Sequence, residues 1–262
     1  QSLQAFDPAG VAMAKVNFYA YGTLRYGVDP AAGALDGDLW DELLTGAGPG
    51  LVFPPHVRGF DFDMTTVRAI PAVNFYASSY PSYGARVAAG DLDGDRFAEI
   101  VAAPGPGASY APTIRGFSYR GAVVQPMSRV VFDAFPARQY GAETAEGDVD
   151  ADFYDEIAAA PGPGPTLPVR FRGFGFDDRA IATLPGFDVV AYPTFFGGSP
   201  SLGDLVEDGR EDLATGAGPD PAASARLKLY SYDGTTLRPE PMLLLAFPGG
   251  YGLQVAAANL DL

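Results

Sequence analysis

The sequence predicts an all-β fold, a β-propeller of four-stranded blades. The 262-residue chain contains 33 glycines and 24 prolines, spread among many Val, Tyr and Phe residues. That mixture is typical of short strands joined by turns. The chain also repeats itself, and each repeat divides into four short apolar segments. A repeat of about 40–60 residues that holds four strands is typical of a propeller blade.

The repeat is anchored on an aromatic residue followed by glycine. "VNFYAYGTLRYG" at 16–27 matches "VNFYASSYPSYG" at 73–84. The anchors are Tyr26, Tyr83, Tyr140, Phe196 and Tyr251. They divide the chain into units 26–82, 83–139, 140–195 and 196–250. We expect one domain over 1–262, in which the terminal segments 1–25 and 251–262 pair as a partial blade.

The second unit shows how the strands are expected to fall, at 83–92, 99–103, 113–119 and 129–135. Residues 3–7 resemble a third strand, 14–21 a fourth, and 251–260 a first. Five blades are therefore predicted, one of them shared between the termini, which would close the ring without loose edges. That blade would lack its second strand. Four blades with flanking strands, or a segment of a larger ring, stay open as alternatives.

Charge and composition exclude several classes of partner. The formal net charge is −15 and the chain has no cysteine. An acidic chain does not suit nucleic acid or anionic membrane surfaces, so we expect no nucleic-acid partner. No apolar run approaches the roughly 18 residues of a membrane span. The absence of cysteine excludes disulfides and thiolate metal sites.

An acidic loop follows each anchor. In "GDLDGDRFAEIVAAPGPG" at 90–107, Asp91, Asp93, Asp95 and Glu99 place four carboxylates within nine residues. Such charges repel each other unless a cation, a catalytic arrangement or solvation offsets them. Calcium prefers six to eight hard oxygen ligands in loose geometry, which this spacing can offer. An EF-hand is a poor alternative, because the prolines that follow would break its second helix.

The combination of an aromatic-Gly start, a D-x-D-x-D loop, an apolar strand and a Gly-Pro-rich end resembles the FG-GAP repeat. This family includes the propeller of integrin α-subunits and many bacterial extracellular proteins. The resemblance covers four units and part of a fifth. It implies a calcium site in each loop, with side-chain oxygens from loop positions one, three, five and nine and a backbone carbonyl from position seven.

Carried over residue by residue, the resemblance implies two full sites and two poorer ones. The second unit offers Asp91, Asp93, Asp95, the carbonyl of Phe97, and Glu99. The third offers Asp148, Asp150, Asp152, the carbonyl of Tyr154, and Glu156. The first, with Ala34 at position one, offers Asp36, Asp38, the carbonyl of Trp40, and Glu42. The fourth, with Val206 at position three, offers Asp204, Asp208, the carbonyl of Arg210, and Asp212. The family's usual glycine at position six is present only as Gly209, so the other loops are expected to depart from the family's geometry.

The leading functional hypothesis is a calcium-stabilised, non-enzymatic binding or adhesion module that is secreted or lies on the cell surface. Its partner would be an unidentified protein or glycan. A carbohydrate-binding lectin is the first alternative, and a polysaccharide lyase or hydrolase the second. His56 is the only histidine and is expected to be structural. The repeated basic residues Arg58, Arg115, Arg172 and Lys228 are expected to pair with repeated carboxylates.

Overall fold

The computed structural model describes residues 2–22, 25–38, 40–63 and 65–257. Every regular element in these ranges is a β-strand, and the eighteen strands form five antiparallel sheets. The described residues contain no helix that is long and apolar enough to cross a membrane. The predicted all-β propeller is confirmed.

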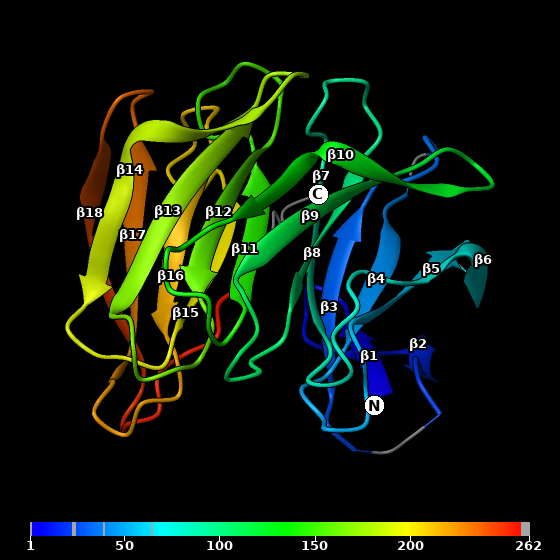
Figure 1. Cartoon of the computed structure of the whole chain (residues 1–262), viewed down its shortest axis with the longest axis horizontal. Coiled ribbons are helices and arrows are strands. Elements are labelled where there is room, and N and C mark those ends of the chain that lie inside the picture. The colour runs from blue at the N-terminus through cyan, green and yellow to red at the C-terminus, as the bar shows by residue number, and fades with distance from the viewer. Residues whose placement is uncertain (1, 23–24, 39, 64, 258–262) are drawn as a thin grey trace.

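Four of the sheets have four strands each and form the blades (Figure 1). Blade one contains β3 (Val28–Gly33), β4 (Glu42–Ala47), β5 (His56–Phe62) and β6 (Val67–Tyr76). Blade two contains β7 (Ala85–Gly90), β8 (Glu99–Pro104), β9 (Thr113–Tyr119) and β10 (Val124–Asp133). Blade three contains β11 (Ala142–Gly147), β12 (Glu156–Pro161), β13 (Val169–Phe176) and β14 (Ile181–Tyr192). Blade four contains β15 (Gly198–Gly203), β16 (Asp212–Ala217), β17 (Ala225–Tyr232) and β18 (Leu237–Phe247).

The first strands of the blades line the centre of the molecule. β3, β7, β11 and β15 are neighbours in this order. Together with residues 254–257 they surround a cavity of about 440 Å³. The apolar core lies mainly between adjacent blades, where Phe75 packs on Phe117 and Phe132 on Phe174, with ring centroids 4.7 and 4.6 Å apart.

The fifth sheet has only two strands, β1 (Ser2–Phe6) and β2 (Ala12–Tyr19). It lies beside blade one, where the ring of Phe18 packs on Phe60 at 4.6 Å. Just after β2, the Tyr21 hydroxyl donates to the carbonyls of Thr45 and His56, both at 2.8 Å. These links repeat the contacts that a fourth strand makes with the next complete blade.

The described residues therefore form four complete blades and a half blade. The five-blade count that was predicted from the sequence is present only in part, because β1–β2 and residues 251–257 do not form a complete sheet. The alternative of four blades with flanking strands describes the observed sheets. The predicted first strand at 251–260 is described as far as residue 257, where it is extended but not paired as a strand. Residues 258–260 lie outside the described residues.

The observed strands lie at the predicted positions, except for the first and fourth strands of a unit, whose bounds differ. In blade two, β8 and β9 fall where expected. The first strand begins at Ala85, because Tyr83 and Gly84 adopt left-handed φ angles of 66° and 67° and cannot join the ladder. The fourth strand begins at Val124, earlier than expected, and its register shifts between Met127 and Val131.

The repeated basic residues have a different role from the one predicted. Arg172 donates to the carbonyl of Ala134 at 2.6 Å, and Arg58 and Lys228 donate to the carbonyls of Ala20 and Ala191. Each acceptor lies just after or near the end of the preceding blade's fourth strand. The expectation of repeated carboxylate partners was wrong, because the carbonyl of the neighbouring blade is the nearer acceptor. Arg172 also forms an ion pair with Asp188, at 3.6 Å.

Candidate metal centres

Each acidic loop joins the first strand of a blade to its second, and the four loops are linked to one another across the three boundaries between the complete blades. The amide of Ala98 donates to the carbonyl of Ala34 at 2.7 Å. The equivalent amides of Asp155 and Glu211 donate to the carbonyls of Asp91 and Asp148, each at 2.8 Å. The loops are therefore held in a row by the same inter-blade hydrogen bond, repeated along the ring.

The second, third and fourth loops share two left-handed backbone positions despite their different sequences. Positions four and six have left-handed φ angles of 70° and 71° at Gly94 and Arg96, and of 63° and 71° at Ala151 and Phe153. Glu207 and Gly209 hold the same positions in the fourth loop, with φ angles of 59° and 83°, so the lack of glycine at position six does not make the second and third loops differ from it. Position six of the first loop, Leu39, lies outside the described residues. The carboxylate at position one compensates, because that of Asp91 accepts hydrogen bonds from the amides of Asp95 and Arg96 at 3.0 and 2.7 Å.

Three of the four loops bring carboxylate oxygens together. In each group, one oxygen from every residue lies within 4.8 Å of the others. The groups are Asp36, Asp38 and Glu42 in the first unit, Asp91, Asp93 and Glu99 in the second, and Asp148, Asp150 and Glu156 in the third. An arrangement of this kind suits a hard cation.

The glutamate at position nine lies at the bottom of each group. Glu42 and Glu99 are almost completely buried. One oxygen of each, Oε2, accepts the amide of Leu35 at 2.6 Å or of Leu92 at 3.2 Å. The other, Oε1, is buried without a hydrogen-bond partner. A buried carboxylate oxygen in that state is costly.

Burial raises the pKa values of the three position-nine glutamates. Burial, followed by repulsion from Asp93 and Asp95, raises the pKa of Glu99 to about 8. Burial likewise raises the pKa of Glu156 to about 8, although the amide of Val149 opposes the shift. Burial raises the pKa of Glu42 to about 7. Without a cation, the loops therefore favour protonated glutamates.

The remaining predicted ligands are placed differently. At position five, Asp95 and Asp152 use one oxygen each to accept the amide two residues on, at 3.0 and 2.9 Å. Position seven is occupied by Trp40, Phe97, Tyr154 and Arg210. A side chain added to Gly37 or Gly94 would meet the rings of Phe97 or Tyr154, so these rings cover the preceding loop.

The fourth loop does not form such a group within the described ranges. Asp212 is buried, and its Oδ2 accepts the amides of Leu205 and Val206, each at 2.9 Å. Asp204 accepts the amides of Asp208 and Gly209, each at 3.0 Å. These carboxylates are used to hold the loop. Loop four therefore has the geometry of the others without their gathered oxygens.

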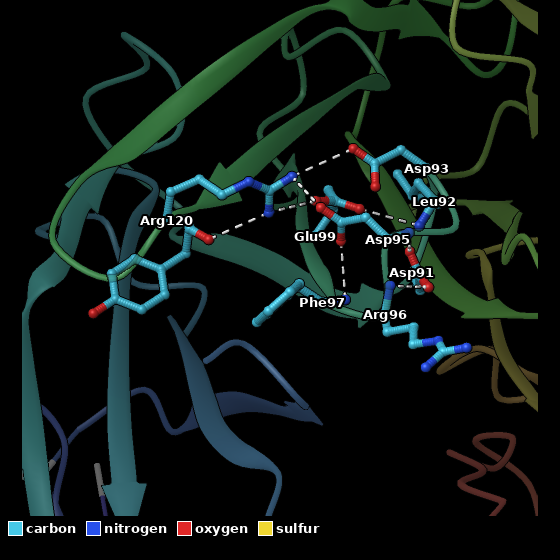
Figure 2. A network of polar contacts seen from close by, with 9 residues as sticks. Asp91, Leu92, Asp93, Asp95, Arg96, Phe97, Glu99 and Arg120 are labelled. Carbon is cyan, nitrogen blue, oxygen red and sulfur yellow. Dashed lines mark hydrogen bonds and ion pairs between the residues drawn. The ribbon is translucent and has the colours of Figure 1, made fainter. Parts of the chain in front are cut away.

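Sequence reasoning missed Arg120, which follows β9 and reaches into the second loop. Its guanidinium nitrogens lie 3.4 Å from Asp93, 2.8 Å from Asp95 and 3.6 Å from Glu99 (Figure 2). The equivalent residues in the other units are Asp63, Asp177 and Asp233. This break in the repeat was the signal that could have identified it. Arg120 supplies positive charge to the second loop only.

Comparison with known proteins leaves the family open. No protein-family model matches the chain, and no curated protein matches it either.

Proposed function

We propose that this protein is a calcium-stabilised binding module of the FG-GAP kind that acts outside the cell without enzymatic activity. The observation that carries the proposal is the buried position-nine glutamate. Its Oε1 has no hydrogen-bond partner in two loops, and in three loops one of its oxygens lies within 4.8 Å of an oxygen from each of two aspartates. A buried carboxylate oxygen without a hydrogen bond, in a group of three carboxylates, suits a cation site.

The residues fit calcium better than a transition metal. The gathered groups are carboxylates in all three loops, and oxygen ligands suit calcium or magnesium, whereas imidazole and thiolate ligands favour zinc or copper. Calcium, when bound, would supply two positive charges to each group. Glu42, Glu99 and Glu156 would hold it from below, with Asp38, Asp93 and Asp150 among the partners. In the second loop the Arg120 guanidinium would have to give way.

The role of such sites is structural, because an ion that binds only the folded state adds its binding free energy to stability. The loops lie in one row along the ring, so their ions would fix the edge of the ring on which they lie. Binding of a protein or glycan, adhesion and secretion are part of the proposal and rest on the resemblance to FG-GAP propellers. A propeller fold alone does not select among activities.

A thermal melt tests the metal proposal. The protein is treated with EDTA, and calcium is titrated back at fixed high ionic strength, so that screening of the −15 charge stays constant. We expect a saturable rise in Tm with calcium and a smaller one with magnesium. The double variant Glu99→Gln/Glu156→Gln should lose most of the rise. The matched variant Glu207→Gln, in the fourth loop, should keep it. A Tm that calcium does not move would overturn the proposal.

A further inference from the structure

The centre of the propeller has four different polar residues at equivalent positions. The second residue of each first strand belongs to this inner quartet, which consists of Asp29 on β3, Arg86 on β7, Glu143 on β11 and Ser199 on β15. Strand pairing makes the four equivalent, because each lies opposite the fifth residue of the second strand in its blade. The fourth residue of the same first strands is alanine in three blades. The repeat is therefore broken at the inner quartet.

Two members of the inner quartet hold a neighbouring segment in place. Asp29 Oδ2 accepts the amide of Val87 at 2.7 Å. The hydroxyl oxygen of Ser199 accepts the amide of Val255 at 3.1 Å. In both cases the side chain of one inner segment binds the backbone of the next, which is a structural use of this position.

The other two members cannot form that hydrogen bond. Arg86 has no acceptor atom, so it leaves the amide of Thr144 without this partner. Beside Glu143, the third residue of β15 is Pro200, which has no amide hydrogen. Thr144 and Pro200 hold the place of Val87, because all three pair with the fourth residue of a second strand. Arg86 and Glu143 are therefore not needed to join the strands in this way.

Arg86 lies between two carboxylates instead. Its Nη1 is 3.3 Å from Asp29 Oδ1, and its Nε is 2.9 Å from Glu143 Oε1. The three side chains are 14–21% exposed and carry one net negative charge together. Glu143 Oε2 accepts no hydrogen bond in the part of the chain that the structure describes. This acceptor lies beside Arg86 and the Ser199 hydroxyl, both of which have further hydrogens to donate.

Two cavities meet at the inner quartet. The central cavity of about 440 Å³ is surrounded by the four first strands and residues 254–257. A second cavity of about 310 Å³ extends from it beside Phe196. Glu143, Ser199 and Gln254 line both cavities. Small-molecule sites measure about 300–1,000 Å³ and place a few polar groups in such a space.

We propose that the inner quartet is a carbohydrate site, which binds a sugar unit of a glycan through its hydroxyl groups. A hydroxyl group both donates and accepts hydrogen bonds. It can donate to Glu143 Oε2 and accept from Arg86 or Ser199. The site lies near the start of the first strands, whereas each acidic loop follows the end of one. The proposal rests on the binding function proposed above and names its class of ligand, but it uses none of the candidate metal centres.

Charge favours a neutral ligand over a charged one. Two carboxylates already neutralise Arg86, so an anion would meet a group of net negative charge. A small cation would gain from Glu143 but would leave the donors of Arg86 and Ser199 without acceptors, and unpaired donors in an enclosed site are costly. A ligand with several hydroxyl groups satisfies the acceptor and the donors together.

The test is a titration followed by saturation-transfer NMR. The probes are the methyl glycosides of glucose, galactose, mannose, xylose and N-acetylglucosamine. Tetrahydropyran-2-methanol, which has a sugar-like ring but one hydroxyl group, and n-butylammonium chloride are the control compounds. We expect saturable binding of at least one glycoside and about tenfold weaker binding, or less, of both controls. Ionic strength is fixed, and the same glycoside should bind in calcium and in EDTA.

Three variants locate the site. Glu143→Gln should weaken binding of that glycoside about tenfold. Glu207→Gln removes an equal charge from the fourth loop and should leave binding unchanged. Pro200→Ala gives the third residue of β15 an amide that can donate to Glu143, as Val87 donates to Asp29. It should weaken glycoside binding about threefold or more, although it adds a hydrogen bond to the folded protein.

The carbohydrate site and the metal centres can fail separately. No glycoside binding would overturn the carbohydrate site, and so would binding that Glu143→Gln and Pro200→Ala leave unchanged. Tighter binding of n-butylammonium than of every glycoside would also overturn it, because the inner quartet would then be a cation site. Glycoside binding by a protein whose Tm calcium does not move would support the carbohydrate site and overturn the metal proposal alone.

Discussion

At the scale of single residues, the acidic loops bring several carboxylates close together, and their mutual repulsion must be offset by positive charge. Glu99 is buried beside Asp93 and Asp95, and the only cationic side chain recorded beside this group in the described structure is that of Arg120. An exposed or half-exposed ion pair contributes at most about 1 kcal/mol. Arg120 is therefore a weak substitute for a divalent ion, and it occupies the oxygens that such an ion would use.

Removing Arg120 should make the second loop a better metal site. We expect Arg120→Gln to raise the affinity for terbium, used as a luminescent calcium analogue, about three- to tenfold, because Asp93 and Asp95 no longer need to be separated from the guanidinium. Arg68→Gln removes an equal charge from the exposed Arg68–Asp63 pair and is the matched control. Equal affinities for the two variants would show that Arg120 does not compete for the site.

The raised pKa values of the position-nine glutamates predict an unusual pH dependence for the metal-free protein. The pKa of Glu99 and of Glu156 is about 8 in the folded state, against about 4.3 for an unfolded glutamate. The folded state binds more protons in between, so stability is full below about pH 4.3 and is lost as pH rises through about 8. We expect the Tm of the EDTA-treated protein to fall by several degrees from pH 5 to pH 8.5.

The control for this pH dependence is the double variant Glu99→Gln/Glu156→Gln, which should lose much of the slope, because neither amide titrates. Saturating calcium should also remove the slope, since a bound cation favours the ionised form. If the double variant kept the slope of the unmodified protein, the general repulsion of a −15 chain would be its cause instead.

At the scale of the element, the second, third and fourth acidic loops are turns with two left-handed residues each, and their sequences do not always favour that conformation. Phe153 has a φ of 71° and is 85% exposed, so its ring contributes little packing to offset the strain. A non-glycine residue in this region costs about 1–3 kcal/mol. We expect Phe153→Gly to raise the free energy of unfolding by about 1 kcal/mol in urea titration.

Two further substitutions separate strain from the loss of the ring. Phe153→Ala keeps the Cβ and should give no such gain. Gly209→Ala adds a Cβ at a φ of 83° where nothing lies within 4 Å, so it should lower stability by about 1 kcal/mol through backbone strain alone. A gain from Phe153→Ala equal to that from glycine would mean that the exposed ring, and not the φ angle, is unfavourable.

The loops also show what the sequence predicted and what it could not. The spacing of Asp91, Asp93 and Glu99 was enough to predict that their carboxylates meet, because alternate residues of a tight loop point to one centre. The role of Asp95 was not predictable in this way, since its carboxylate is shared between a local amide and Arg120. The contacts of Arg120 join the end of β9 to the loop between β7 and β8. They depend on how these strands are aligned in the blade, and the spacing of residues within the loop does not contain that information.

At the scale of the whole molecule, the internal repeat predicted the blades because each inter-blade contact recurs at the same place. It did not settle the closure of the ring. Closure depends on whether the half blade β1–β2 meets blade four, and Phe6 on β1 and Leu244 on β18 are both exposed. The half blade β1–β2 is therefore joined to the ring mainly through blade one, whereas every inner blade has neighbours on both sides.

This asymmetry predicts that the same substitution has different effects at two equivalent places. Tyr192 donates to the carbonyls of Thr215 and Arg226 at 2.8 and 2.7 Å between blades three and four. Tyr192→Phe leaves these acceptors unpaired inside the ring and should cost about 1–3 kcal/mol of global stability. Tyr21→Phe breaks the matching bonds to Thr45 and His56, but β1–β2 can open alone. We expect faster hydrogen exchange over residues 2–19 by mass spectrometry and a smaller change in Tm than with Tyr192→Phe. Equal losses of Tm in the two variants would mean that the half blade unfolds together with the ring.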